Sequence, residues 1–236
     1  MVQAVLLWLA ALAAAPADTK TFTGTGDWND AARWGGIVPT NGDDAVIANS
    51  VTVSVDQATA DLSSLTNNGT LIFLGTNTAL IATNVAINGI VTHPSQPDTN
   101  GTPGVYTDWT PDHRVWIVCS NLVVNGSGRL DVNGKGYQGV PPTGAAVAGR
   151  GPGGGAVSDW AGGGGYGGIG GIAGNGTAGG PNYGDPADPV DPGSSGGSAY
   201  NYTPPGKGGN GGGAVRIEAS GRVTVDGTII AAGDNS

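Results

Sequence analysis

Apolar and polar residues alternate along two stretches of the chain that repeat one pattern. The first is VWIVCSNLVVNGSGRLDVNG at residues 115–134, and the second is VRIEASGRVTVDGTIIAAG at residues 215–233. Short alternating runs broken by Asn-Gly or Asp-Gly are typical of β-strands with one buried face. Two short gaps, both at turns, align Val115, Ile117, Cys119, Leu122, Val124 and Leu130 with Val215, Ile217, Ala219, Val223, Val225 and Ile229.

Two earlier stretches carry parts of the same pattern: ALIATNVAINGIVTH at residues 79–93 and LSSLTNNGTLIF at residues 62–73. Repeats of this kind predict an all-β fold, a right-handed parallel β-solenoid of about four to five coils. A meander of hairpins is the alternative, since Asn-Gly is also the strongest short hairpin signal. A meander does not require the same three-strand pattern to recur, so we favour the solenoid.

The alignment assigns three polar or reactive residues to faces of the strands. Cys119 falls at an inward position opposite Ala219, which predicts a small buried core residue and not a reactive thiol. Asn67 falls where other copies have apolar residues, so it is either a buried asparagine bonded along the stack or a sign that the first coil is irregular. Asp131 lies between two apolar residues and is expected to face outward.

Residues 135–212 separate the two best copies and are predicted to be a glycine-rich excursion from the solenoid. From Tyr166 this segment repeats X-Gly-Gly with a period of three, which is the repeat of a polyproline II helix. Such helices could pack through their glycine faces and carry Tyr166, Ile169 and Ile172 on the third face. A flexible, disordered linker is the alternative.

These patterns divide the chain into five parts. Residues 1–17, an apolar run ending in Ala-Pro-Ala, are predicted to be a signal peptide, so the protein would be secreted or on the cell surface. The other parts are an N-terminal cap at 18–42, solenoid coils at 43–134 with a loop at 93–113, the insertion at 135–212 and a final coil at 213–236. An open solenoid end is an aggregation hazard, so we expect further coils beyond Ser236 or a partner at this end.

The segment GDWNDAARWGGIVPTNGDDAVIANSVTVSVD at residues 26–56 resembles the start of β-helical surface proteins. The match is carried by Trp34, Val38, Pro39, Gly42, Asp43, Val46 and Ile47. Extended to LTNNGTLIF, it is similar to the eight-glycine domain of large extracellular proteins. The later GGGGYGGIGG and GGGAVRIEASGRVTVDGTIIAAG resemble glycine-rich modules of very large secreted bacterial proteins. The resemblance implies adhesion, surface display or contact with polysaccharide.

Charge and cysteine content narrow the class of partners. The formal net charge is −9 and no basic run occurs, which argues against nucleic acid. No segment is long and apolar enough to predict a membrane span. Cys119 is the only cysteine, so no internal disulfide can form, and an exported chain without disulfides suggests a bacterial source.

Catalytic motifs are weak. GKGYQG at residues 134–139 has the spacing of a dinucleotide fingerprint, but the Val-Pro-Pro that follows does not begin a helix. The aspartates could serve a polysaccharide lyase or hydrolase, which requires two carboxyl groups close together. Asp131 aligns with Ile230, so no ladder of aspartates is expected there.

Two metal sites and one set of aromatic residues are candidate binding features. Asp185, Asp188 and Asp191 lie three residues apart and could offer oxygen ligands to calcium, the one cofactor considered. His93 and His113 flank a loop whose ends are expected to be close, and could bind a metal. A solvated turn and ordinary surface histidines are the respective alternatives. Aromatic residues of the insertion could form a glycan-binding row, and these are Trp160, Tyr166, Tyr183, Tyr200 and Tyr202.

Three functions therefore compete. The favoured hypothesis is an exported structural or adhesive module without catalytic activity, whose partners are a surface polysaccharide or a protein. A glycan-binding module that uses the aromatic residues of the insertion is the second hypothesis. A fragment of a β-helical polysaccharide lyase or hydrolase is the third.

Overall fold

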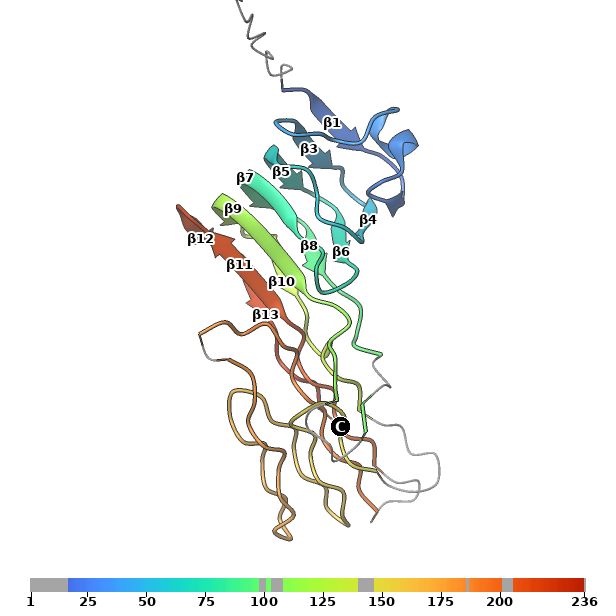
Figure 1. The fold of residues 1–236 in the computed structure, drawn as a ribbon, viewed down its shortest axis with the longest axis vertical. Helices are drawn as coiled ribbons and strands as arrows, with labels where there is room; N and C mark the ends of the chain where they lie inside the picture. Colours follow the sequence, from blue (N-terminus) through green and yellow to red (C-terminus); the bar gives the residue numbers. More distant parts are fainter. Residues whose placement is uncertain are drawn as a thin grey trace, which may run out of the picture.

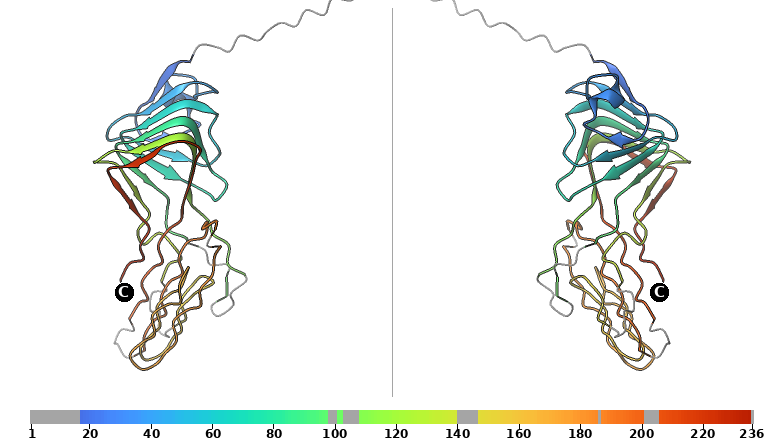
Figure 2. Two further views of the ribbon diagram at one scale, coloured as in Figure 1. Left: turned by 90° about the vertical axis from the view of Figure 1, so that its left-hand side faces the viewer. Right: turned by 90° about the vertical axis from the view of Figure 1, so that its right-hand side faces the viewer.

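The computed structural model describes residues 17–97, 101–102, 108–139, 147–185, 187–200 and 206–235. The predicted signal peptide lies outside the described residues, apart from Ala17. The molecule is elongated, with two parallel β-sheets at one end and glycine-rich extended segments at the other (Figure 1). Views from two opposite sides, each perpendicular to that of Figure 1, show the glycine-rich segments running side by side away from the sheets (Figure 2).

From β1 to β11, successive strands alternate between the two sheets, and β12 stays in the first sheet before β13 returns to the second. The first sheet contains β1 (Thr19–Phe22), β3 (Asp44–Ile47), β5 (Leu62–Asn67), β7 (Leu80–Ile87), β9 (Val115–Val124), β11 (Val215–Ala219) and β12 (Val223–Val225). The second sheet contains β2 (Gly26–Asp27), β4 (Thr52–Val55), β6 (Thr70–Phe73), β8 (Ile90–Thr92), β10 (Arg129–Asp131) and β13 (Thr228–Ile230). One short 3₁₀ helix, η1 (Ala31–Trp34), follows β2.

Every pairing between these strands is parallel, so the hairpin meander is wrong and the parallel all-β prediction is confirmed. The predicted register is confirmed as well, because β11 and β12 both pair with β9 and β13 pairs with β10. Cys119 lies opposite Ala219, and Asp131 lies opposite Ile230.

The core lies between the two sheets and consists of the inward residues of successive strands. Leu65, Val85 and Leu122 follow one another in register in β5, β7 and β9 and are buried. Cys119 is buried in a second row, in register after Leu62 and Ala82, and burial raises the pKa of its thiol, which keeps it protonated and unreactive. This confirms its place as a small core residue.

Asparagines and glycines hold the turns between the sheets. Asn67 is fully buried; its Nδ2 donates to the Ile90 carbonyl in the next turn of the chain, at 2.9 Å, and its Oδ1 accepts from Gly69 N. The buried-asparagine alternative is therefore correct. Next to it, Asn125 donates to Asn88, and Asn88 donates to Asn68, so the amide side chains form a ladder along the stack.

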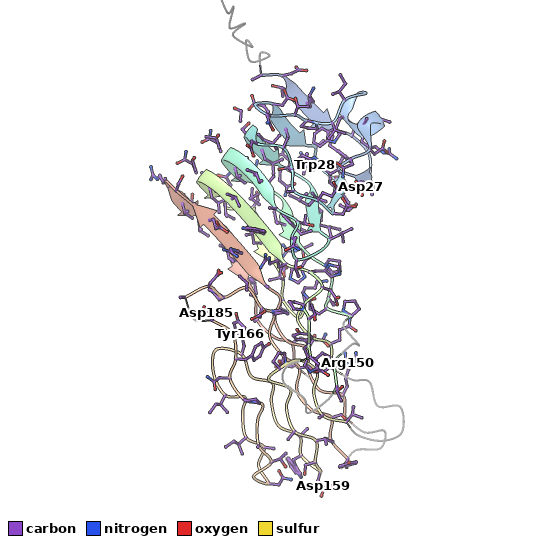
Figure 3. The ribbon with its side chains drawn as sticks, in the orientation of Figure 1. Asp27, Trp28, Arg150, Asp159, Tyr166 and Asp185 are labelled. Atoms are coloured by element: carbon purple, nitrogen blue, oxygen red, sulfur yellow. The ribbon has the colours of Figure 1, made fainter. Side chains whose placement is uncertain are left out.

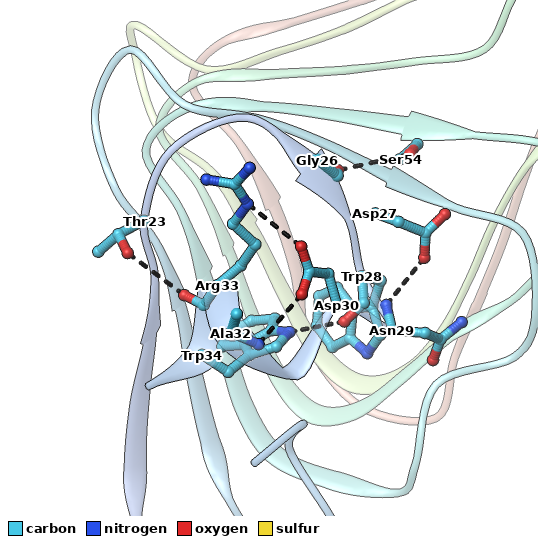
Figure 4. Close-up of polar contacts among 10 residues, drawn as sticks. All are labelled: Thr23, Gly26, Asp27, Trp28, Asn29, Asp30, Ala32, Arg33, Trp34 and Ser54. Carbon is cyan, nitrogen blue, oxygen red and sulfur yellow. Dashed lines mark hydrogen bonds and ion pairs between the residues drawn. The ribbon is translucent and has the colours of Figure 1, made fainter. Parts of the chain in front are cut away.

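Three aromatic rings close the N-terminal end of the core, and Figure 4 shows two of them, Trp28 and Trp34. Trp34 packs edge-on against both Phe22 and Trp28, with ring centroids 5.0 and 4.8 Å apart, and its indole N–H donates to the Trp28 carbonyl. The side chain of Asp30 caps η1 by accepting from Ala32 N, and Gly35 ends it with a left-handed φ of 77°. All three rings are buried.

The glycine-rich segments are joined by backbone hydrogen bonds and contain no β-strand among their described residues. The segment 193–198 bonds to more neighbours than the two that a β-strand can have, with N···O distances of 2.8–3.3 Å. Its partners are Tyr137, Val147, Arg150, Gly155, Gly162, Gly165, Gly209 and Gly212. We call this array, formed by residues 134–139, 147–183, 193–199 and 206–214, the glycine bundle.

Most glycines of the bundle are required because a side chain would not fit between the neighbouring backbones, and few are required for their backbone conformation. Among its described glycines only Gly134, Gly151 and Gly176 have a φ in the left-handed region. A Cβ atom at most of the others would come within 3.0 Å of a neighbouring backbone, which real Cβ atoms essentially never do. Such positions include Gly155, Gly162, Gly170, Gly180, Gly208 and Gly211.

Two neighbouring glycines test this packing. A methyl group at Gly170 would collide with the backbone of Gly163, whereas a methyl group at Gly171 meets nothing within 4 Å. We expect Gly170→Ala to lower the free energy of unfolding by roughly 2–3 kcal/mol, because two backbones must separate. Gly171→Ala should leave it unchanged or raise it by up to about 1 kcal/mol, because alanine restricts the unfolded chain. Scanning calorimetry of both variants decides; equal effects would contradict the packing.

Candidate functional site

A groove of about 990 Å³ runs along one side of the glycine bundle. Residues 160–166 line one wall, and residues 206–213 line the other together with 231–235. The segment 193–199 lies between these walls, because it bonds to Gly162 on one side and Gly209 on the other. The volume is in the range of natural ligand sites, and glycines supply most of the lining, so backbone groups dominate its surface.

A few side chains give the groove its chemistry. Trp160 lies at one end with 53% of its surface exposed, and Tyr166 lies further along the same wall. Figure 3 places Tyr166 near the sheets and Asp159, the neighbour of Trp160, at the distal end of the bundle. The charged residues Asp191, Lys207 and Asp234 complete the lining. An exposed indole beside backbone amides and a few charges suits a polar ligand with one apolar face.

The five aromatic candidates do not share one environment. Tyr183 is largely buried: its hydroxyl donates to the Pro192 carbonyl and accepts from Ser194 Oγ, and burial raises its pKa above the ordinary value. Its ring packs edge-on against Tyr166 at 5.1 Å. Tyr200 is 52% exposed and does not line the groove. Tyr202 lies outside the described residues.

The three aspartates of the proposed calcium site contact arginines and backbone. Asp188 pairs with Arg216 at 3.5 Å, and Asp185 accepts from Ala187 N at 2.8 Å. Burial raises the pKa of Asp191, and the charge of Arg114 opposes that rise. Within the described residues, no group of three or more His, Cys, Asp or Glu side chains is placed to hold a metal ion.

The two histidines take part in backbone contacts at the junction of the sheets and the glycine bundle. His93 is fully buried; its Nδ1 lies 2.6 Å from the Pro94 carbonyl, and its Nε2 accepts from Ala214 N at 3.1 Å. These partners assign the proton to Nδ1 and leave neither nitrogen for a metal. Nδ1 of His113 accepts from Gly75 N at 2.9 Å. His93 thus ties the loop after β8 to the residue that precedes β11.

The residues that complete this junction were not found by sequence reasoning. Gln96 is fully buried, and its side chain bonds to the backbone of Asp112 and His113, which closes the base of the loop. Trp109 packs edge-on against the buried ring of Tyr137 at 5.5 Å. Tyr137 belongs to the GKGYQG segment, so this segment packs against the loop. An isolated Gln and Tyr among polar residues give no periodic signal.

His93 should make stability depend on pH. Burial lowers its pKa from 6.5 to about 4, and the charges of His113 and Lys135 act in the same direction. Between these values the unfolded chain binds a proton that the folded chain does not, so the free energy of unfolding falls as pH falls from 6.5 to about 4. Over this pH range the free energy of unfolding falls by about 3 kcal/mol in total. We expect His93→Gln to remove this part of the pH dependence in urea unfolding, and His113→Gln to remove less. An unchanged pH profile in His93→Gln would contradict the assignment.

Comparison with known protein families finds a match for one part of the chain. Residues 33–103 match the family model of the G8 domain, a domain typical of extracellular proteins, and this span includes β3 to β8. The resemblance to the eight-glycine domain is confirmed over this span. Comparisons with curated proteins and with solved structures give no match. In the part of the chain that the structure describes, no helix is long and apolar enough to cross a membrane.

Proposed function

We propose that this chain is an exported structural or adhesive module without catalytic activity. The observation that carries the proposal is the glycine bundle, which extends away from the sheets to a distal end marked by Asp159 (Figure 3). Trp160, the next residue, and Tyr200 are both exposed. These two residues lie close together, since Tyr200 N donates to the carbonyl of Ser158. Exposed aromatic residues at the end of a long support are well placed to contact a surface.

The supporting body is, we infer, a short right-handed β-solenoid with polyglycine helices attached. The alternation of strands between two parallel sheets, with each strand paired to the strand one turn later, supports the solenoid. Segments bonded to several neighbours, in which most glycines have no left-handed φ value, support helices of the polyproline II type. The same proposal includes secretion directed by a signal peptide at residues 1–17 and a bacterial source. The G8 match supports an extracellular location.

A second candidate is glycan binding in the groove. Its size, the exposed face of Trp160 and the surrounding backbone groups favour this candidate. Sugar rings present apolar faces that stack on aromatic side chains and hydroxyls that bond to amides and carboxylates. On this hypothesis Trp160 would contact the glycan, whereas the equally exposed Tyr200 would not, because it lies outside the groove.

One experiment tests both functions. The chain is displayed on a non-adherent cell, and cells retained under flow are counted on protein-coated and polysaccharide-coated surfaces. Adhesion through the distal region predicts that both Trp160→Ala and Tyr200→Ala reduce retention severalfold. Glycan binding predicts retention on polysaccharide alone, lost in Trp160→Ala and kept in Tyr200→Ala. Retention no higher than that of cells displaying nothing, on every surface, would reject both.

A further inference from the structure

One edge of the glycine bundle carries two outward isoleucines. Ile169 and Ile172 are 73% and 71% exposed, more than any other large apolar side chain among the described residues. They belong to one continuous segment, residues 169–174, which we call the glycine edge. The segments before and after it in the chain are both described, so its exposure is a property of the packed bundle.

The backbone of the glycine edge is hydrogen-bonded towards the bundle and free on its outer side. Gly170 N donates to the Gly180 carbonyl at 2.9 Å. The Gly171 carbonyl accepts from Gly163 N, also at 2.9 Å. Within the described residues, the N–H groups of Gly171 and Ile172 donate to no other backbone group, and both residues are exposed. Free backbone groups along an extended segment are where a further backbone pairs, as at the edge of a β-sheet.

Two glycines of the edge are not required by the fold of a single chain. A Cβ atom at Gly171 or Gly174 would meet nothing within 4 Å, and neither residue has a left-handed φ. Alanine at such a position restricts the unfolded chain and so stabilises the folded one, which glycine does not do. A second backbone that approaches the edge closely would require glycine there, because it leaves no room for a side chain.

The exposed residues of the glycine edge are complementary to themselves. In chain order they are Ile169, Gly171, Ile172 and Gly174. A two-fold axis between Gly171 and Ile172 reverses this order on a second copy, so that every isoleucine faces a glycine. Ile169 then lies opposite the partner's Gly174, and Ile172 lies opposite the partner's Gly171. Large residues that face small ones allow two segments to interdigitate, and a two-fold contact is complete with two copies.

We propose that the glycine edge binds the glycine edge of a second copy of this chain, antiparallel about a two-fold axis. The contact buries the isoleucines of each copy against the glycines of the other. It is small compared with a permanent interface, so it is weak between single molecules and gains strength where many copies are displayed together. It requires neither a polysaccharide nor a coated surface, so its failure would leave the proposed function untouched.

Sedimentation equilibrium of the chain tests the proposal. Between about 10 µM and about 1 mM we expect a monomer–dimer equilibrium with a Kd on the order of 0.1–1 mM. Gly171→Ala should raise this Kd about tenfold without destabilising the fold, because the methyl group takes the space of the partner's Ile172. Gly126→Ala is the matched control and should leave the Kd unchanged, since its Cβ also meets nothing within 4 Å but lies in a turn between the sheets.

A change of charge tests the apolar part of the contact. Ile172→Lys should abolish the dimer, whereas Ile37→Lys, at an isoleucine of similar exposure outside the bundle, should not. A monomeric wild type at every concentration, a dimer that persists in Ile172→Lys, an unchanged Kd in Gly171→Ala, or open-ended polymers would overturn the proposal. A monomeric chain that binds a synthetic peptide of Ile-Gly-Gly repeats would reject the second copy in favour of a glycine-rich segment of another protein.

The register is tested without any substitution by isotope-filtered NMR on a mixture of labelled and unlabelled chain. We expect nuclear Overhauser effects from the methyl groups of Ile172 to the partner's Gly171, and from those of Ile169 to the partner's Gly174. Intermolecular contacts from these methyl groups to other residues alone, or no such contacts in a dimeric sample, would reject the register.

Discussion

The close approach of one polypeptide backbone to another is the constraint on which the glycine bundle depends. Ordinary cores separate backbones by side chains, and burial of those side chains supplies most of the stability. In the bundle, the backbones themselves form the contact: an added Cβ at Gly155, Gly180 or Gly208 would enter a neighbouring main chain. Each backbone hydrogen bond contributes only about 0.5–1.5 kcal/mol net, so many must form together to offset the entropy of ordering glycine.

Serine hydroxyls supplement these bonds at the centre of the bundle. Ser194, Ser195 and Ser198 are buried, and their hydroxyls accept from the backbone N–H groups of Gly153, Arg150 and Val147. Serine is small enough to fit between closely packed segments and satisfies a donor that would otherwise be buried without a partner. The bundle is joined to the sheets at His93, whose imidazole bonds to Ala214, and at Tyr137, whose ring packs against Trp109.

Periodic features of the sequence predicted the sheets well. The pairing of residues 115–132 with 215–231 follows from alternation alone, because a parallel stack repeats each inward position at the same place in every coil. Asn67 interrupts the alternation of apolar residues, and the sequence left two explanations of it open. The structure shows a buried amide, because the Asn67 side chain forms hydrogen bonds to Gly69 N and to the Ile90 carbonyl. The period of three indicated that the glycine tract has regular structure.

The site was predicted less well, because it depends on contacts between residues far apart in the chain. His93 and His113 were considered as metal ligands from their place at the ends of a loop, yet backbone groups occupy the nitrogens of His93. Tyr166 and Tyr183 pack against each other, while Trp160 and Tyr200 are exposed; no local pattern separates these pairs. The groove arises from the order in which the glycine segments pack, which composition does not specify.

Hydrogen exchange across residues 162–180 tests the central claim most directly. In the ordered bundle the amides of Gly163, Gly165, Gly170 and Gly180 donate to neighbouring segments, so they should exchange orders of magnitude more slowly than the same amides in an unfolded chain. The exposed Gly167 and Gly168 serve as an internal reference and should exchange faster. Exchange of the whole segment within seconds would show a disordered linker and contradict the account.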